Sequence, residues 1–220
     1  MALYQDRVDA AHKLLATLPE IEPGKAVILA LPRGGVPIGD VIAKALNAPL
    51  DLILVRKVPS PQNPELALGA VTGAHELTVN DRVRRMLGLT PQDVQNLAAT
   101  QVEEIDRRRD LYLGGKAPVS LIGRTAIVVD DGIATGATAL AALKAVKARQ
   151  PDRIILAVPV ASEDVLAELR AMVDQIICPA PHLPYGAVGA AYTNFPQVSD
   201  KEVIALLRLQ DEVGQAERPA

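Results

Sequence analysis

Residues Ala126–Ala139 read AIVVDDGIATGATA and carry the strongest structural signal in the chain. The apolar run Ala126–Val129 predicts a buried strand, which Asp130 and Asp131 follow directly. A helical pattern then begins at the small residues near Gly136. In an open parallel sheet, ligands bind beyond the carboxyl ends of the strands, and a helix that starts there offers free N–H groups to phosphate. The stretch therefore predicts an α/β fold with an anion site.

The rest of the chain alternates short aliphatic runs with segments of helical period, as parallel strands and crossover helices do. The expected strands are Ala26–Leu31, Leu50–Val55, Thr125–Val129, Ile154–Val160 and Gln175–Cys178. The expected helices are Tyr4–Leu18, Val36–Leu46, Pro91–Leu111, Gly136–Ala148 and Asp164–Met172. We expect one Rossmann-like parallel sheet of about five strands, flanked by helices, in a single domain over residues 1–220.

Composition and charge narrow the class of protein. The net charge of −3 and the pI near 5.7 give no general attraction for a polyanion, so a nucleic-acid partner is not expected. The sequence contains no apolar run long enough to span a bilayer and no signal-peptide pattern, so we expect no membrane association and a cytoplasmic location. The single cysteine, Cys178, lacks metal-ligand spacing and is expected to be structural.

The aspartate pair Asp130 and Asp131 has two interpretations. Alone, it could be a solvated acidic turn before a helix cap. After a buried strand, two adjacent carboxylates are costly unless cations or hydroxyl donors lie nearby, and a ribose diol with a metal supplies both. The chain has neither GxxxxGK[ST] nor GxGxxG after the first strand, so two common phosphate loops are excluded.

The string VVDDGIATGAT resembles the phosphoribosyl diphosphate motif of the type I phosphoribosyltransferases. The resemblance implies that Asp130 and Asp131 bind the ribose hydroxyls, and Mg²⁺ directly or through water. It implies a catalytic role for both aspartates, and that the motif's small residues wrap the 5'-phosphate. The phosphoribosyl-binding residues implied in this way are Asp130, Asp131, Gly132, Ala134, Thr135, Gly136, Ala137 and Thr138.

A second segment, Leu31–Pro37, follows the first expected strand and reads LPRGGVP. By itself it could be a turn that starts a helix. Beside the first motif it is similar to the family's pyrophosphate loop, in which a non-proline cis peptide turns backbone amides toward the diphosphate. The resemblance implies that Arg33, Gly34 and Gly35 bind diphosphate, that Arg33 is catalytic, and that the bond from Pro32 to Arg33 is cis.

A third segment, Val55–Val58, is expected to close the second strand, where charges point toward the shared ligand crevice. Its charges could also be ordinary solvated strand ends. The resemblance implies that Lys57 neutralises diphosphate in catalysis and that residues 58–80 form a mobile loop over the reaction. No lysine or tyrosine occurs between Val58 and Asn80, so the closing contacts of better-studied branches cannot be carried over.

The acceptor is expected under a small hood built from residues 179–200 and the N-terminal helix. Aromatic residues make up only 2% of the chain, which directs attention to Tyr185, Tyr192 and Phe195. They could stack on a flat base, or they could simply pack the C-terminal segment.

The more detailed resemblance is to a sparsely characterised bacterial subgroup of these transferases. It rests on the segments 6–18, 63–73 and 187–207, and extends over roughly residues 3–209. It implies transfer of phosphoribosyl from 5-phosphoribosyl 1-diphosphate, with Mg²⁺, to a nitrogenous base or similar acceptor. The alternative is a catalytically weak regulator that senses nucleotides or the donor. Such a regulator could also bind RNA, as some members of this fold do. A homodimer is left open.

Overall fold

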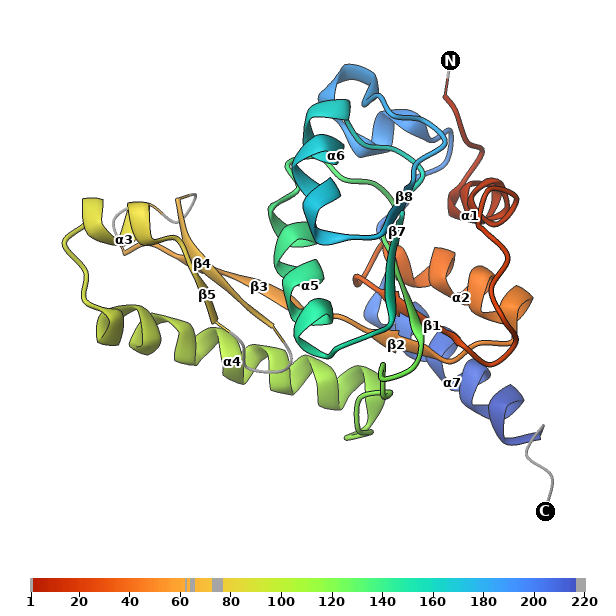
Figure 1. Ribbon diagram of the computed structural model, residues 1–220, viewed down its shortest axis with the longest axis horizontal. Coiled ribbons are helices and arrows are strands. Elements are labelled where there is room, and N and C mark those ends of the chain that lie inside the picture. Colours follow the sequence, from red (N-terminus) through yellow and green to blue (C-terminus); the bar gives the residue numbers. More distant parts are fainter. Residues whose placement is uncertain (1, 62, 64–65, 73–76, 217–220) are drawn as a thin grey trace.

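A five-stranded parallel sheet, in the order β2-β1-β6-β7-β8, forms the centre of the molecule (Figure 1). The computed structural model describes residues 2–61, 63, 66–72 and 77–216. The parallel strands are β1 (Ala26–Ala30), β2 (Leu50–Leu52), β6 (Thr125–Val129), β7 (Arg153–Ala157) and β8 (Gln175–Ile177). Val129 is in register with both Ala30 and Ala157, so three strands end together at one edge of the sheet. The predicted fold class is confirmed.

Helices cover both faces of this sheet (Figure 1). One layer contains α1 (Arg7–Leu15), α2 (Gly35–Leu46) and α7 (Asp200–Ala216), and the other contains α5 (Ala137–Ala148) and α6 (Glu163–Leu169). Successive strand residues face opposite layers, so Ile28 packs with the first layer and Leu29 with the second. Because both faces are buried, the strands show no alternation of polar and apolar residues.

A second, antiparallel sheet was not predicted. It consists of β3 (Val55–Pro59), β4 (Ala67–Thr72) and β5 (Leu77–Val79), and it packs along α4 (Pro91–Leu113) beside α3 (Asp81–Met86). In Figure 1 this unit projects away from the central sheet.

The predicted second strand, Leu50–Val55, is therefore wrong beyond Leu52. The apolar residues continue past the end of β2 because Leu54 and Val58 are also buried, although the chain has left the parallel sheet. Residues 58–80, expected to be a loop, contain β4 and β5. Residues 62, 64–65 and 73–76 of that segment lie outside the described residues.

The helix boundaries follow local capping chemistry. Thr90 and Asp93 form a capping box at the start of α4. The helix ends at Leu113, two residues beyond the predicted limit, because Gly114 follows with a φ of 59°. The predicted helix Asp164–Met172 is divided into α6 and a 3₁₀ turn, Arg170–Met172. No helix in the described part of the chain is both long and apolar enough to cross a membrane.

The N-terminal segment packs against residues 191–194, which are distant in sequence. Tyr4 forms an isolated bridge with Tyr192, and the N–H groups of Thr193 and Asn194 donate to the carbonyl oxygens of Tyr4 and Gln5. The short 3₁₀ helices Pro184–Gly186 and Val188–Ala191 precede this contact. We call the assembly of residues 3–7 and 183–196 the N/C cap. It lies next to the end of β6, because the Tyr192 hydroxyl donates to the Asp131 carbonyl oxygen.

Candidate active site

Asp130 and Asp131 leave the carboxyl end of β6 as a partly buried pair. The Asp131 N–H donates a 2.8 Å hydrogen bond to Oδ1 of Asp130. Burial, and then the charge of Asp131, raise the pKa of Asp130 well above its ordinary value of 3.8. Burial also raises the pKa of Asp131, against the opposing effect of Arg7. Without a ligand, the pair therefore retains a proton more readily than two exposed carboxyls would.

The loop Arg33–Gly35 lies directly against these aspartates. An added Cβ on Gly34 would overlap the Asp131 carboxylate, and one on Gly35 would come within 2.6 Å of the Val129 carbonyl oxygen. Only glycine allows this approach of the two loops. The peptide bond between Pro32 and Arg33 is cis, as expected. The structure thus brings together the first two segments that the sequence singled out.

Residues Ala134–Thr138 lead from the aspartates into α5. Ala134, Thr135, Ala137 and Thr138 are exposed, whereas Gly136 is buried. Gly136 has a φ of 76° and packs close to Val165, so the turn requires glycine. No side chain caps this helix, and the first-turn N–H groups of an α-helix have no intrahelical partner. The turn therefore presents backbone donors and a positive dipole end to an anion.

Arg33 lies at the mouth of the same region and pairs with Asp200, the first residue of α7. Nη1 of Arg33 lies 3.3 Å from Oδ1 of Asp200, which also accepts a 2.6 Å hydrogen bond from the Tyr112 hydroxyl. The Tyr112 hydroxyl, and to a smaller extent Arg33, hold the pKa of Asp200 below its ordinary value. The Arg33 side chain is one-third exposed, so it remains accessible to a ligand.

Arg7 joins the site from α1. Its Nε and Nη2 lie 2.9 Å and 2.8 Å from Oδ2 of Asp131, with side chains only 10% and 14% exposed. Arg7 and Arg33 line a cavity of about 320 Å³, together with Gly34 and Asp131. The remaining lining residues come from the chain just before α7: Phe195, Pro196, Gln197 and Val198.

The sequence predicted that Lys57 would lie at the end of a strand of the parallel sheet, and this prediction is wrong. Lys57 is an exposed residue of β3, in register with Ala70 in the second sheet. Lys57 lies in the second sheet because β2 ends at Leu52 and the chain then crosses to β3. Lys57 is absent from the lining of the cavity beside Asp131.

The three expected hood aromatics have different environments. Tyr185 is 98% exposed, whereas Tyr192 is 5% exposed and lies between Tyr4 and Phe195, with ring centroids 5.4 Å and 4.7 Å away. The Arg7 guanidinium lies 3.9 Å from the Phe195 ring centroid. Tyr192 and Phe195 therefore make extensive contacts within the N/C cap. Of the three, only Phe195 lines the 320 Å³ cavity.

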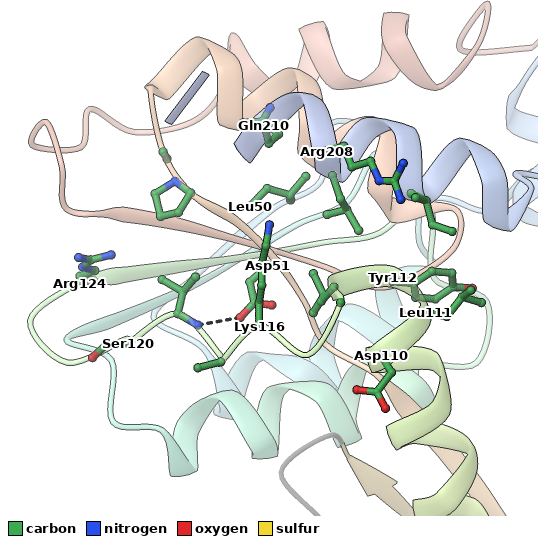
Figure 2. A pocket seen from close by; sticks show the side chains of 18 of the residues that line it. Leu50, Asp51, Asp110, Leu111, Tyr112, Lys116, Ser120, Arg124, Arg208 and Gln210 are labelled. Carbon is green, nitrogen blue, oxygen red and sulfur yellow. Dashed lines mark hydrogen bonds between the residues drawn. The ribbon is translucent and has the colours of Figure 1, made fainter. Parts of the chain in front are cut away.

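The larger cavity, about 880 Å³, lies at the opposite edge of the sheet (Figure 2). Its lining includes Gly24, Pro49 and Arg124, which lie one or two residues before the starts of β1, β2 and β6. Asp51 within it accepts a 2.9 Å hydrogen bond from the Val119 N–H. Figure 2 shows Arg124 and Arg208 on opposite sides of this cavity. Its size does not make it the active site, because the aspartates are at the other end of the strands.

Sequence reasoning missed Arg7 and Asp200. Arg7 meets a partner 124 positions away, and Asp200 meets Arg33 across 167 positions. Both residues lie in segments that carry the detailed resemblance, 6–18 and 187–207, but no local pattern shows which residues they contact. Only the tertiary structure identifies them.

Comparison with known proteins decides the family. The family model for the phosphoribosyl transferase domain matches residues 2–188. This chain belongs to that family. The phosphoribosyl transferase domain is 41% identical over 207 residues to a protein found in two strains of Mycobacterium tuberculosis, whose name assigns it provisionally to the phosphoribosyl transferases. The match covers 94% of this chain but 47% of each relative, so the chain spans about half their length.

The phosphoribosyl transferase domain is also similar to the crystal structure of TT1426 from Thermus thermophilus. The two chains are 37% identical, with a TM-score of 0.81, over 94% of this chain and 98% of the other. The agreement extends over nearly the whole of both chains, so the domain shares its complete fold with that protein.

Proposed function

We propose that this domain transfers phosphoribosyl from 5-phosphoribosyl 1-diphosphate to a nitrogenous base or similar acceptor and releases diphosphate. The observation that carries the proposal is the packing of Arg33–Gly35 against Asp131, beside the open amino end of α5. A 5'-phosphate would occupy the Ala134–Thr138 turn, and the ribose hydroxyls would meet Asp130 and Asp131. Family membership supports the general activity.

The residues also suit a donor that arrives with Mg²⁺. Within the described residues, no group of three or more His, Cys, Asp or Glu side chains could hold a metal ion by itself. One or two carboxylates and substrate phosphates are, however, a common Mg²⁺ environment. Asp130 and Asp131 would hold it, directly or through water. When bound, Mg²⁺ would supply further positive charge to the diphosphate.

Transfer breaks the bond between the anomeric carbon and a diphosphate oxygen, and forms a bond from that carbon to the acceptor. Positive charge builds on the sugar near Asp130 and Asp131, while negative charge builds on the leaving diphosphate near Arg33. The Gly34 and Gly35 backbone would orient that group, and Lys57 would approach it from the second sheet. Catalysis is then placement and charge stabilisation, with no side-chain nucleophile.

The 320 Å³ cavity is our candidate acceptor site. It shares Gly34 and Asp131 with the proposed donor site and is lined by Phe195 of the N/C cap. Its volume is at the small end of ligand pockets, which span about 300–1,000 Å³. Phe195 is the hood aromatic that can contact an acceptor there, whereas Tyr192 would support it from behind.

Diphosphate release tests the proposal. The full chain is incubated with donor, Mg²⁺ and a panel of purine, pyrimidine and pyridine bases, and products are identified by mass spectrometry. We expect release that depends on one class of base and is lost in Asp130→Asn. Donor binding without turnover of any base would favour the regulatory alternative. A folded protein that neither binds nor consumes the donor would refute the proposal.

A further inference from the structure

We propose that Arg7 is a positioning residue of the donor site, which holds the Asp131 carboxylate in the orientation that binds the ribose. The proposal rests on the proposed function. It assigns a role to the N-terminal helix, whose residues lie far in sequence from the phosphoribosyl motif. Arg7 acts through Asp131.

The contact between the two side chains is directional. Nε and Nη2 of Arg7 both lie within 3 Å of Oδ2 of Asp131, so one oxygen is held by two nitrogens of a rigid, planar group. Both of these contacts go to Oδ2 of Asp131. The pair therefore fixes the rotation of the carboxylate without using both of its oxygens.

Arg7 is itself held from two further sides. Its Nη1 donates a 2.8 Å hydrogen bond to the Pro196 carbonyl oxygen, and its guanidinium carbon lies 3.9 Å from the Phe195 ring centroid. Backbone hydrogen bonds join the preceding residues, Tyr4 and Gln5, to Thr193 and Asn194. The guanidinium thus has little freedom to leave Asp131, as expected for a group that orients a binding residue.

The position of Asp131 also makes its orientation important. Gly34 lies so close to the carboxylate that a Cβ there would overlap it. A rotation of Asp131 would therefore disturb the Arg33–Gly35 loop as well as the ribose contact. By holding Oδ2 of Asp131, Arg7 preserves both the ribose contact and the packing of the Arg33–Gly35 loop.

The experiment measures donor binding by calorimetry in the presence of Mg²⁺. Arg7→Met keeps the apolar stem of the side chain and removes the guanidinium. We expect its donor dissociation constant to rise about 10- to 100-fold, as for loss of other groups that orient a ligand-binding residue. Arg7→Lys, which can still approach Oδ2 with a charged donor, should recover part of this loss.

Lys13→Met is the matched control. Lys13 lies on the same helix, 4.8 Å from the Tyr4 ring centroid. Its half-exposed side chain pairs with Asp9, not with Asp131. The Lys13→Met substitution therefore removes a cation that borders the N/C cap, where Lys13 donates to the Leu3 carbonyl oxygen, without altering the contact to Asp131. Its donor affinity should equal that of the unmodified protein.

A double-mutant cycle separates positioning from an independent contact. In an Asp131→Asn background, Arg7→Met should weaken donor binding by less than twofold further, because the residue that Arg7 orients has already changed. If Arg7→Met does not fold, as checked by circular dichroism, Arg7→Lys takes its place in the cycle.

Three results would overturn the role of Arg7 while leaving the proposed function intact. Two of them are a folded Arg7→Met variant that binds donor as the unmodified protein does, and fully additive effects in the cycle. Loss of affinity in Lys13→Met equal to that in Arg7→Met would also overturn it, since both would then report general damage to the N/C cap. Failure of the unmodified, folded protein to bind donor would instead refute the proposed function.

Discussion

The hydroxyl of Tyr192 donates a 2.6 Å hydrogen bond to the backbone carbonyl oxygen of Asp131, across 61 positions of sequence. This bond ties the N/C cap to the residue that the sequence placed at the centre of the ribose site. With the Arg7–Asp131 pair, it fixes both the backbone and the side chain of Asp131 from outside the motif. The cap is therefore part of the site's construction.

Tyr192→Phe should loosen this connection. The substitution removes the Tyr192 donor from the Asp131 carbonyl oxygen. Loss of this partly buried hydrogen bond should cost about 0.5–1.5 kcal/mol of unfolding free energy. Urea unfolding measures the loss. Tyr185→Phe removes a hydroxyl from a residue that is 98% exposed and should change the unfolding free energy by less than about 0.5 kcal/mol. Equal stabilities of the two variants would show that the Tyr192 bond contributes nothing.

Asp200→Asn should strengthen donor binding. Asp200 pairs with Arg33, so it would compete with a bound diphosphate for that cation and would repel the diphosphate by its own negative charge. Because this ion pair is largely exposed, we expect a gain of only about two- to fivefold in donor affinity, measured by calorimetry at low salt. Glu202→Gln removes the same charge from the same helix turn and should have a smaller effect. Weaker binding in Asp200→Asn would mean that Asp200 positions Arg33 instead.

Gly34→Ala should abolish donor binding, while the protein still folds. The φ of Gly34 is −61°, which alanine adopts easily, so the damage comes from the overlap of its Cβ with the Asp131 carboxylate. Gly24→Ala is the converse control, since Gly24 has a φ of 76° with open space around it. It should lose about 1 kcal/mol of unfolding free energy and keep its donor affinity. Normal donor affinity in Gly34→Ala would exclude the proposed approach of the two loops.

The raised pKa of Asp130 predicts a pH dependence of stability. The folded protein holds this proton more tightly than the unfolded chain does, so unfolding free energy falls as pH rises above the ordinary carboxyl pKa of 3.8. Asp130→Asn removes that slope. Urea unfolding from pH 5 to pH 8 should show the variant gaining stability relative to the unmodified protein as pH rises, while its donor use is lost. A difference that is constant across this range would contradict the assignment.

The sequence predicted the central sheet well because strands buried on both faces are continuous aliphatic runs, such as AVILA in β1. It also placed the Asp130–Asp131 and Arg33–Gly35 segments at the same edge, since both follow parallel strands. These predictions depend only on residues that are neighbours in the chain.

Other features depend on contacts that local patterns do not report. The run after Leu50 remains apolar whether the chain continues one strand or crosses to another sheet, so β3 and the displacement of Lys57 were not predicted. The same limit applies to Arg7 and Asp200. Their importance comes from partners more than 120 positions away, which the segments around Arg7 and Asp200 do not identify.

Donor titration of the unmodified chain and of the Asp130→Asn, Asp131→Asn double variant tests the central claim most directly. Calorimetry with 5-phosphoribosyl 1-diphosphate and Mg²⁺ should show saturable binding to the unmodified chain. Binding to the folded double variant should be at least about 100-fold weaker, because two charged contacts to ribose and metal are lost. No binding by the folded, unmodified chain, or equal binding by the double variant, would contradict the account.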